Sequence, residues 1–322
     1  MADGSRSFSF PVPQQSALVK AVDFFCGGGG ATDGAEQAGC EVVAAANHSP
    51  TAIAIHAANH PKTKHFCQDL QQMDFSLLPH FDLLLASPAC QGHTHARGKE
   101  RPHHDATRST AWAVIAAMER WLPEAAVIEN VPEFLKWKLF PAWCAALVAL
   151  GYAVSPHLLD AADFGVPQHR KRVFVILTKS KHPLELRFPR RDLVPASSFI
   201  DFNAGKWSLI EQPGRSAATL ARIKAGRAAF GDQFIAPYFG NGSGLTGRSL
   251  SRPIGTITTR DRWAVIDGSR MRMVMVEEAR AAMSFRPSYK LPNNKRDAMH
   301  MLGNAVCPTV EREVILALKA AA

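Results

Sequence analysis

Two stretches of this sequence place a residue that can do chemistry at the end of an apolar run. Cys90 follows the run 81–86 and Pro88, a pattern that predicts a buried strand ending in a turn that carries a thiol. Glu129 follows the run 125–128, where a carboxylate is costly unless it has a partner or a task. Because Cys90 is predicted to lie in a turn at the end of a strand, it is placed to react. A cysteine buried as a small hydrophobe and a glutamate in a structural ion pair are the alternatives that these residues leave open.

A third stretch supplies hydrogen-bond donors. Gln168, Arg170 and Arg172 alternate just before an apolar run at 173–177, so we expect them to share one face of an extended chain. Three donors on one face indicate a clamp for an anion or for the edge of a base.

A glycine-rich stretch follows the first predicted strand, residues 17–25. Asp23 lies in its last part, and glycines fill positions 27–30 before a predicted helix. Glycines let the backbone pass close to a ligand, and the first turn of a helix offers free N–H groups. The order of strand, glycine loop and helix therefore favours a site for a nucleotide-like ligand.

The elements that must position these residues alternate along the first part of the chain. Strands are predicted at 41–46, 65–67, 152–157 and 173–177, and helices at 53–58, 107–121 and 141–150. This alternation predicts an α/β fold with a mostly parallel sheet. Right-handed crossovers would align the strand ends along one crevice, with Asp23, Asn47, His48, Asp69 and Cys90 beside one another.

Composition narrows the classes of protein. The chain has 322 residues, of which 47% are hydrophobic, and its six cysteines form no CxxC pair. We expect no metal site, no disulfide framework and a reducing compartment. Neither a signal peptide nor a membrane span is predicted, so we expect a soluble, cytoplasmic protein. The histidine-rich stretch 93–104 is predicted to be a mobile loop that closes over an anionic substrate.

Positive charge is concentrated in one segment. The net charge is +9, and residues 181–275 hold 15 Lys and Arg against 7 Asp and Glu. Residues 184–275 also lose the regular alternation and interleave arginines with aromatic residues. A small, loop-rich domain that binds a polyanion is predicted there, although a solvated basic surface is the alternative.

Together these motifs resemble the DNA cytosine methyltransferases that modify carbon 5 of the base. The matching pieces occur in that family's order from about residue 20 onward: Asp23-Phe24-Phe25-Cys26-Gly27-x-Gly29-Gly30, Pro88-x-Cys90-Gln91, Glu129-Asn130-Val131, Gln168-x-Arg170-x-Arg172 and Gly303-Asn304-Ala305-Val306.

The resemblance implies a reaction and a role for each matching residue. Cys90 would add to carbon 6 of cytosine, Glu129 would share a proton with N3, and Arg172, with Arg170 beside it, would stabilise charge at O2. The target base would be flipped out of double-stranded DNA. The DNA-binding residues would be Gln91, Thr94, Arg97, Gln168, Arg170 and Arg260.

The family resemblance also implies the cofactor S-adenosylmethionine and leaves S-adenosylhomocysteine as product. The expected cofactor-binding residues are Asp23, Phe25, Cys26, Gly27, Gly29, Gly30, His48, Asp69, Leu70, Pro88, Asn304 and Ala305.

The implied fold is a Rossmann-like methyltransferase domain with a smaller, loop-rich target recognition domain. We expect residues 1–183 to form the catalytic domain, 184–275 the recognition domain, and 276–322 a C-terminal segment that packs back on the first. We expect the protein to bind DNA as a monomer and, in a prokaryote, to be associated with the nucleoid. The resemblance also implies a role in restriction and modification.

Some positions depart from the family pattern. Ala89 replaces a proline, His93-Thr94 replaces Phe-Ser, and His48 stands where an acidic residue binds the cofactor ribose. A tRNA-cytosine methyltransferase and a catalytically silent DNA-binding relative are the alternatives. The complete set of Cys90, Glu129 and Arg172 argues against silence, and the large basic segment favours DNA.

Overall fold

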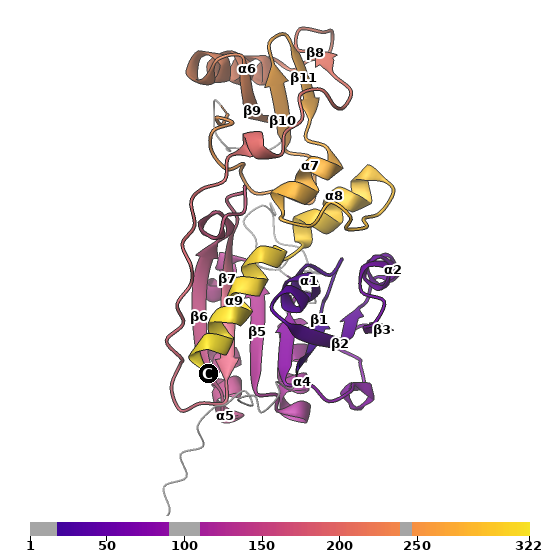
Figure 1. Ribbon diagram of the computed structural model, residues 1–322, viewed down its shortest axis with the longest axis vertical. Coiled ribbons are helices and arrows are strands. Elements are labelled where there is room, and N and C mark those ends of the chain that lie inside the picture. The colour runs from indigo at the N-terminus through magenta and orange to yellow at the C-terminus, as the bar shows by residue number, and fades with distance from the viewer. Residues whose placement is uncertain (1–17, 90–109, 239–246) are drawn as a thin grey trace, which may run out of the picture. The chain divides into compact units, whose positions relative to one another are not determined.

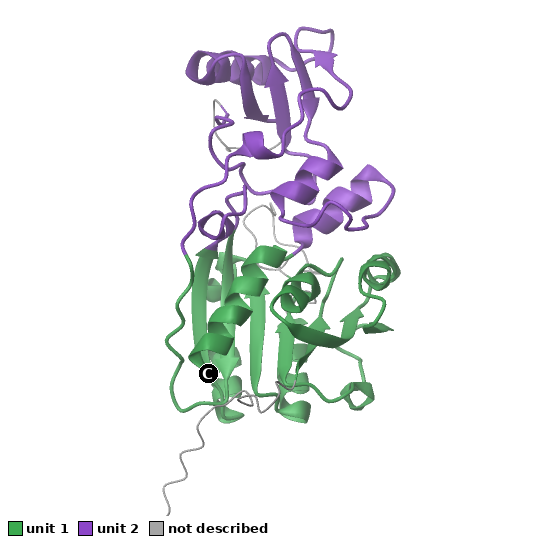
Figure 2. Ribbon diagram, in the orientation of Figure 1, with its two compact units in different colours: residues 1–159, 171–189, 306–322 green, residues 160–170, 190–305 purple. Residues whose placement is uncertain are grey.

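The chain forms two compact units in a computed structural model that describes residues 18–89, 110–238 and 247–322 (Figure 1). Unit 1 comprises residues 1–159, 171–189 and 306–322, and unit 2 comprises residues 160–170 and 190–305 (Figure 2). This division differs from the expected one, because residues 276–305 group with unit 2. Within the described ranges, every helix is too short or too polar to span a membrane.

Unit 1 is built around a seven-stranded sheet of order β3-β2-β1-β4-β5-β7-β6. Its strands are β1 (Val19–Phe24), β2 (Cys40–Asn47), β3 (Lys64–Cys67), β4 (Leu83–Ala86), β5 (Ala125–Asn130), β6 (Ala153–Asp160) and β7 (Lys171–Thr178). Strands β1 to β5 pair in parallel and β7 runs antiparallel to β5. The prediction of an α/β fold with a mostly parallel sheet is therefore confirmed.

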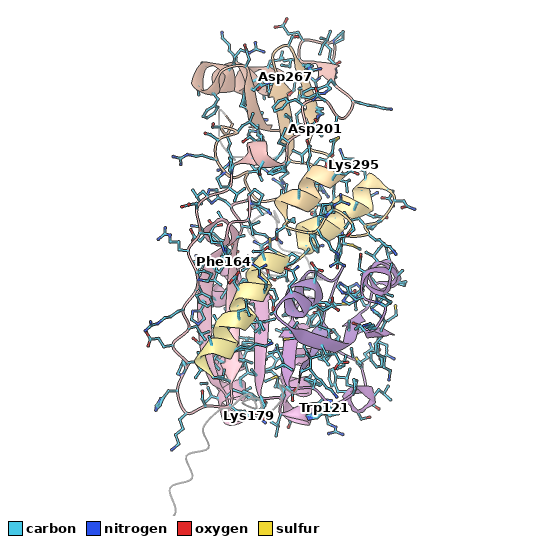
Figure 3. The ribbon with its side chains drawn as sticks, viewed as in Figure 1. Trp121, Phe164, Lys179, Asp201, Asp267 and Lys295 are labelled. Atoms are coloured by element: carbon cyan, nitrogen blue, oxygen red, sulfur yellow. The ribbon has the colours of Figure 1, made fainter. Side chains whose placement is uncertain are left out.

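Helices pack on this sheet where the sequence predicts them. They are α1 (Gly30–Gln37), α2 (Pro50–Asn59), α4 (Thr110–Trp121), α5 (Phe140–Ala149) and α9 (Pro308–Ala321), with short 3₁₀ turns η1 (Phe75–Leu77) and η4 (Pro132–Lys136). The core joins fully buried side chains of β1, β4 and β5 to those of α4 and α5. Trp121 closes α4 against η1, because its indole N–H donates to the carbonyl oxygen of Phe75 at 2.8 Å (Figure 3).

The last helix, α9, packs directly on α1. A Cβ atom at Gly34 would meet the Cβ atom of Glu311 and the carbonyl oxygen of Pro308, each at 2.6 Å. Only glycine permits this close approach. The C-terminal helix thereby packs on the helix that follows the glycine loop.

Unit 2 holds a four-stranded sheet of order β8-β11-β10-β9. Its elements are η5 (Ala161–Phe164), η6 (Ala196–Ser198), β8 (Ser208–Leu209), α6 (Ala217–Phe230), β9 (Gln233–Pro237), β10 (Trp263–Asp267), β11 (Arg270–Met273), α7 (Val276–Ala282) and α8 (Lys295–Asn304). The paired strands are antiparallel, and α6 contributes Ile223 to their core. The predicted small, loop-rich domain has a regular centre that the sequence did not indicate, namely the sheet and the 14-residue helix α6.

A buried ion pair holds unit 2 together beside this sheet. The guanidinium of Arg272 donates to both carboxylate oxygens of Glu278, at 2.6 and 2.8 Å. It also donates to the carbonyl oxygen of Asp201 at 2.8 Å, and the N–H of Asp201 donates to the Glu278 carboxylate at 3.0 Å. Both charged side chains thus have several partners, which is what burial of a charge requires.

Candidate active site

The strands of unit 1 end in register. One row of residues crosses β1 to β5, in which each residue is paired in register with its neighbour: Phe66, Ala46, Phe24, Ala86 and Ile128. The residues that follow this row therefore share one edge of the sheet, the edge where α/β folds place ligands.

The glycine loop leaves β1 at this edge with an unusual backbone. Phe25 has φ of 58° although it is not glycine, and Gly29, which caps α1, has φ of 94°. The loop is held against β2, since the N–H of Cys26 donates to the carbonyl oxygen of Ala46 at 3.2 Å. Backbone strain at a non-glycine residue is found preferentially at functional sites, and the start of α1 presents N–H groups beside it.

The carboxyl group of Asp23 lies fully buried behind this loop. Its Oδ2 accepts a hydrogen bond from the Thr32 hydroxyl at 2.8 Å, whereas Oδ1 has no partner among the described residues. Burial raises the pKa of Asp23 to about 7, although the Thr32 hydroxyl and the positive potential of His60 act in the opposite direction. A buried acceptor left open in this way fits a ligand that brings a donor or a positive charge.

The thiol of Cys26 and the carboxyl group of Glu311 are also fully buried in this region. Burial raises the pKa of the Cys26 thiol well above its usual value, so Cys26 stays protonated and is a poor nucleophile. Burial also raises the pKa of Glu311 on α9, and the carboxylates of Asp23 and Glu129 add to that rise. Glu311 Oε1 lacks a partner among the described residues.

The polar residues after β2 and β3 are exposed at the same edge. His48 directly follows β2, and Asp69 follows β3, where its carboxylate accepts the N–H of Gln71 at 3.0 Å. Leu70 beside it is buried. The structure therefore leaves the side chains of His48 and Asp69 accessible, next to the glycine loop.

Glu129 and Arg172 form an ion pair in unit 1. Glu129 lies on β5 and pairs in register with Phe174 of β7, and Arg172 lies two residues earlier on β7. Arg172 Nε and Glu129 Oε1 are 3.1 Å apart, and both side chains are mostly buried. The sequence motifs that carry these two residues are separated by more than 30 positions, so the antiparallel pairing of β5 and β7 is what brings them together.

The backbone that leads to Cys90 is tied to the same strand end. Asn130 Nδ2 donates to the carbonyl oxygen of Pro88 at 3.1 Å, and the N–H of Ala89 donates to Thr110 Oγ1 at 3.1 Å. Pro88 is buried. Four of the predicted site residues lie outside the described residues: Cys90, Gln91, Thr94 and Arg97.

The predicted donor clamp of Gln168, Arg170 and Arg172 is wrong. Gln168 is fully buried in unit 2, where its amide donates to the carbonyl oxygen of Ala282 and accepts the N–H of Ile257. Arg170 also lies in unit 2 and is 3% exposed, whereas Arg172 lies in unit 1. The alternation applies to an extended chain, but Gln168 and Arg170 precede β7 and face the interior of unit 2.

The terminal nitrogens of Arg170 donate to backbone carbonyl oxygens of unit 2. Nη1 donates to the carbonyl oxygen of Ile257 at 3.1 Å, and Nη2 donates to those of Gly303 and Ala305 at 3.0 and 2.8 Å. Asn304 between them is exposed. The geometry thus corrects the expected catalytic and DNA-binding roles of Arg170 and the DNA-binding role of Gln168: both side chains hold backbone segments of unit 2. Arg260, by contrast, is exposed.

Sequence reasoning missed two sets of buried polar residues in unit 1. One is Glu311, which shares the 3.6-residue spacing of the buried Ile315 and Leu318 on α9 and was detectable by that spacing. The other is a row of Thr32, His56 and His65 behind Asp23, in which His56 bonds to both of the other side chains. No spacing signal links these three residues, because they come from α1, α2 and β3.

Comparisons with known proteins agree with this geometry. A sequence model of the C-5 cytosine-specific DNA methylases matches residues 19–204. The chain is 28% identical over 320 residues to the Type II methyltransferase M.NlaX of Neisseria lactamica, covering 94% of this chain and 97% of the relative. It is 33% identical over 168 residues to M.AgeI of Thalassovita gelatinovora, covering 49% of this chain and 39% of that relative.

The fold also has solved counterparts. The methyltransferase EhMeth of Entamoeba histolytica superposes with a TM-score of 0.67 at 16% identity, covering 94% of this chain and 98% of that one.

Proposed function

The chain belongs to the C-5 cytosine-specific DNA methylases, and from that premise we propose that it transfers a methyl group from S-adenosylmethionine to carbon 5 of cytosine in a specific sequence of double-stranded DNA. The observation that carries the proposal is the Glu129–Arg172 pair, whose strand end is bonded to the backbone just before Cys90. A carboxyl group and a guanidinium therefore lie together at the sheet edge where the described chain stops just before Cys90.

Cys90 is the proposed nucleophile. Carbon 5 of cytosine is activated when a thiolate adds to carbon 6 and forms a carbon–sulfur bond, and the electron pair of the 5,6 double bond becomes available at carbon 5. Negative charge develops toward N3 and O2 in this step. Glu129 would donate a proton at N3, and Arg172 would hold the Glu129 carboxyl group in place while its own charge stabilises O2. Once carbon 5 has gained the methyl group, a water molecule takes the carbon 5 proton, the electron pair restores the 5,6 double bond, and the carbon–sulfur bond breaks to release the thiolate.

The residues of the glycine loop fit the cofactor. Its bound form supplies an electrophilic methyl group on a cationic sulfur. Asp23 Oδ1 is a buried acceptor without a partner among the described residues, and Phe25 presents a half-buried ring beside it. Cys26, Gly27, Gly29 and Gly30 would line the site with backbone, His48 and Asp69 would reach the ribose and adenine, and Leu70 and Pro88 would complete its apolar wall. Asn304 and Ala305 are the residues of unit 2 that the family motif assigns to the cofactor.

Unit 2 is the proposed target recognition region. Residues 181–275 carry most of the excess positive charge, and Arg248, Arg252 and Arg260 are exposed on it. Contacts of arginine with phosphate and with base edges position and specify a DNA site. The enzyme would act as a monomer on flipped-out cytosine, in the cytoplasm of a cell that uses restriction and modification.

Methylation of random-sequence duplex DNA, followed by base-resolution mapping, tests this function. We expect 5-methylcytosine at one recurring sequence, no product with Cys90→Ala, and normal product with Cys144→Ala, since Cys144 lies on helix α5 and not at the strand ends. Methylation of tRNA without methylation of DNA, or full activity of Cys90→Ala, would contradict the proposal.

A further inference from the structure

A chain of hydrogen bonds connects the buried Asp23 with the surface of unit 1. The Thr32 hydroxyl and Asp23 Oδ2 are 2.8 Å apart, Thr32 Oγ1 and His56 Nε2 are 3.0 Å apart, and His56 Nδ1 and His65 Nε2 are 2.8 Å apart. Asp23, Thr32 and His56 are fully buried, whereas His65 is partly exposed. The chain therefore begins at a carboxyl group without solvent contact and ends at a side chain that reaches water.

We propose that Thr32, His56 and His65 form a proton relay for Asp23, so that binding of the cationic cofactor drives the Asp23 proton through this chain to solvent. The proposal rests on the proposed function, because the positive charge is that of the methyl donor. Thr32, His56 and His65 are positioning residues in this scheme, and Asp23 is the group that meets the ligand.

Each link of the chain works in both directions. When Asp23 is ionised, His65 donates to His56, His56 donates through Nε2 to Thr32, and the Thr32 hydroxyl donates to Oδ2. When Asp23 carries a proton on Oδ2, every bond reverses and His56 Nδ1 donates to His65. A hydroxyl and a neutral imidazole both hold one donor and at least one acceptor, so both states satisfy every link.

His56 is suited to pass a proton without keeping it. Burial, together with the neighbouring His60 and His65, lowers the pKa of His56 to about 2, so the ring stays neutral. The pKa of His65 is also lowered, chiefly by burial. A proton that reaches His65 is therefore given up to solvent rather than stored.

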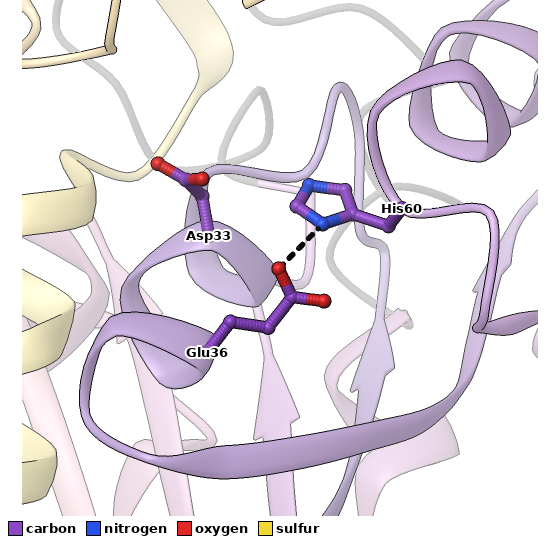
Figure 4. A group of neighbouring side chains, drawn as sticks. All are labelled: Asp33, Glu36 and His60. Atoms are coloured by element: carbon purple, nitrogen blue, oxygen red, sulfur yellow. Dashed lines mark hydrogen bonds and ion pairs between the residues drawn. The ribbon is translucent and has the colours of Figure 1, made fainter.

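The charged groups around Asp23 leave its open oxygen without a partner among the described residues. From α1 and α2, Glu36 and His60 are bonded to each other at 2.9 Å, and Asp33 lies beside them (Figure 4). From the glycine loop and α9, the neutral Cys26 and Glu311 face the same region. Hydrogen bonds from Thr32 and the charge of His60 favour the ionised form of Asp23, but burial outweighs them, and His60 is already engaged with Glu36.

A bound cation changes this balance. The pKa of Asp23 is about 7 in the free protein, and a positive ligand close to the carboxylate lowers it. If Asp23 becomes fully ionised in the complex, binding releases about 0.9 proton at pH 6, about 0.5 at pH 7 and about 0.1 at pH 8. Affinity then falls about tenfold from pH 8 to pH 6 through this group alone.

Titration calorimetry of the full chain with S-adenosylmethionine, in two buffers of different ionisation enthalpy, counts these protons. The reference is Asp23→Asn, which shares every other titrating group, including those of the cofactor. We expect the wild type to release about 0.5 proton more than this variant at pH 7. Repeating the titration with S-adenosylhomocysteine, which lacks the sulfonium charge, identifies the charge that Asp23 senses. The difference between the wild type and Asp23→Asn disappears if Asp23 senses the sulfonium and persists if it senses the ammonium group of the ligand.

Variants of the chain test the relay itself. Thr32→Val removes the donor to Asp23 and should raise proton release at pH 8, whereas Thr32→Ser should restore the wild-type count. His56→Phe should shift the count in the same direction as Thr32→Val, by less. Thr63→Val is the matched control, since Thr63 is buried and donates to the carbonyl oxygen of Val42 outside the chain.

Two outcomes overturn the inference. Equal proton release by the wild type and Asp23→Asn removes Asp23 from the linkage while leaving the proposed function intact. Unchanged counts in Thr32→Val and His56→Phe remove the relay. A wild-type chain that binds no cofactor at all overturns the proposed function as well, which separates the two failures.

Discussion

Units 1 and 2 both bury charged side chains, but they treat them differently. In unit 2, Arg272 and Glu278 bond to each other twice, and Arg170 donates to three carbonyl oxygens. In unit 1, Asp23 and Glu311 each keep one oxygen without a partner among the described residues. A buried charge that is bonded several times stabilises architecture, although Arg272 Nε and Asp261 Oδ1 of unit 2 also lack a partner among the described residues. A buried acid with an open acceptor and a raised pKa, as in unit 1, indicates a place where a ligand or a proton completes the arrangement.

The largest effect should come from breaking the bonded pair of unit 2. Arg272→Ala leaves Glu278 buried and uncompensated and should destabilise the protein by about 3–5 kcal/mol. Arg270→Ala is the matched control, because the Arg270–Asp267 pair has the same shortest contact of 2.6 Å but an Arg270 side chain that is 46% exposed. We expect less than about 1 kcal/mol there. Urea unfolding measures both, and equal losses would show that burial does not decide the outcome.

A second prediction separates the buried from the exposed arginines of unit 2. Arg260→Ala should weaken DNA binding and lower the slope of log affinity against log salt concentration by about 1, because one phosphate contact is lost. Arg170→Lys should leave that slope unchanged and instead destabilise unit 2, since an ammonium cannot reproduce the fork of donors to Ile257, Gly303 and Ala305. A lower salt slope in Arg170→Lys would return Arg170 to the DNA-binding residues.

Replacing the buried carboxyl group of Glu311 should stabilise the protein, whereas breaking the buried ion pair of unit 2 destabilises it. The pKa of Glu311 is raised in the folded chain, so the unfolded chain ionises first as pH rises above the usual value of 4.5, and stability falls. Glu311→Gln removes this dependence. We expect the variant to melt at a higher temperature than the wild type at pH 8 and to match the wild type near pH 4. Calorimetric melting at both pH values tests it, and an equal gain at pH 4 would point to packing instead.

The smallest expected effect is a change in cofactor affinity on substitution of His48, which is exposed at the end of β2 in unit 1. His48→Glu would place a carboxylate after β2, where it can accept two hydrogen bonds from ribose hydroxyls. A charge-assisted bond in place of a neutral one is worth on the order of 1 kcal/mol, so cofactor binding should tighten several-fold. His80→Glu, at a residue in the segment that leads into β4, is the control for the added charge. Identical affinities of His48→Glu and the wild type would place His48 outside the cofactor site.

The sequence predicted unit 1 better than unit 2 for a physical reason. Parallel strands buried on both faces appear as short apolar runs, so β1, β2, β4, β5 and β7 stand out. Helix α6 has only Thr219, Ile223 and Gly226 buried, so its apolar periodicity is too weak to reveal a helix. Strands β9 and β10 pair across a long connection, and no hairpin signal marks them.

The residues of the candidate site also fall into two groups, those that local sequence reveals and those whose partners are distant along the chain. Motifs identified Asp23, Glu129 and Arg172, because a strand end can be recognised from local sequence. The partners of Gln168 and Arg170 lie 87 to 135 residues away along the chain, so the fate of their donors depends on long-range packing. The link between Thr32, His56 and His65 is invisible for the same reason.

Covalent trapping on DNA tests the central claim that the edge of unit 1 activates cytosine through Cys90. The wild type is incubated with S-adenosylmethionine and with duplex DNA in which 5-fluorocytosine replaces cytosine. Since fluorine cannot leave as the carbon 5 proton does, the thiolate cannot be eliminated. We predict a denaturant-resistant adduct, formed more slowly by Glu129→Gln and not at all by Cys90→Ala. An adduct that persists in Cys90→Ala would contradict this account.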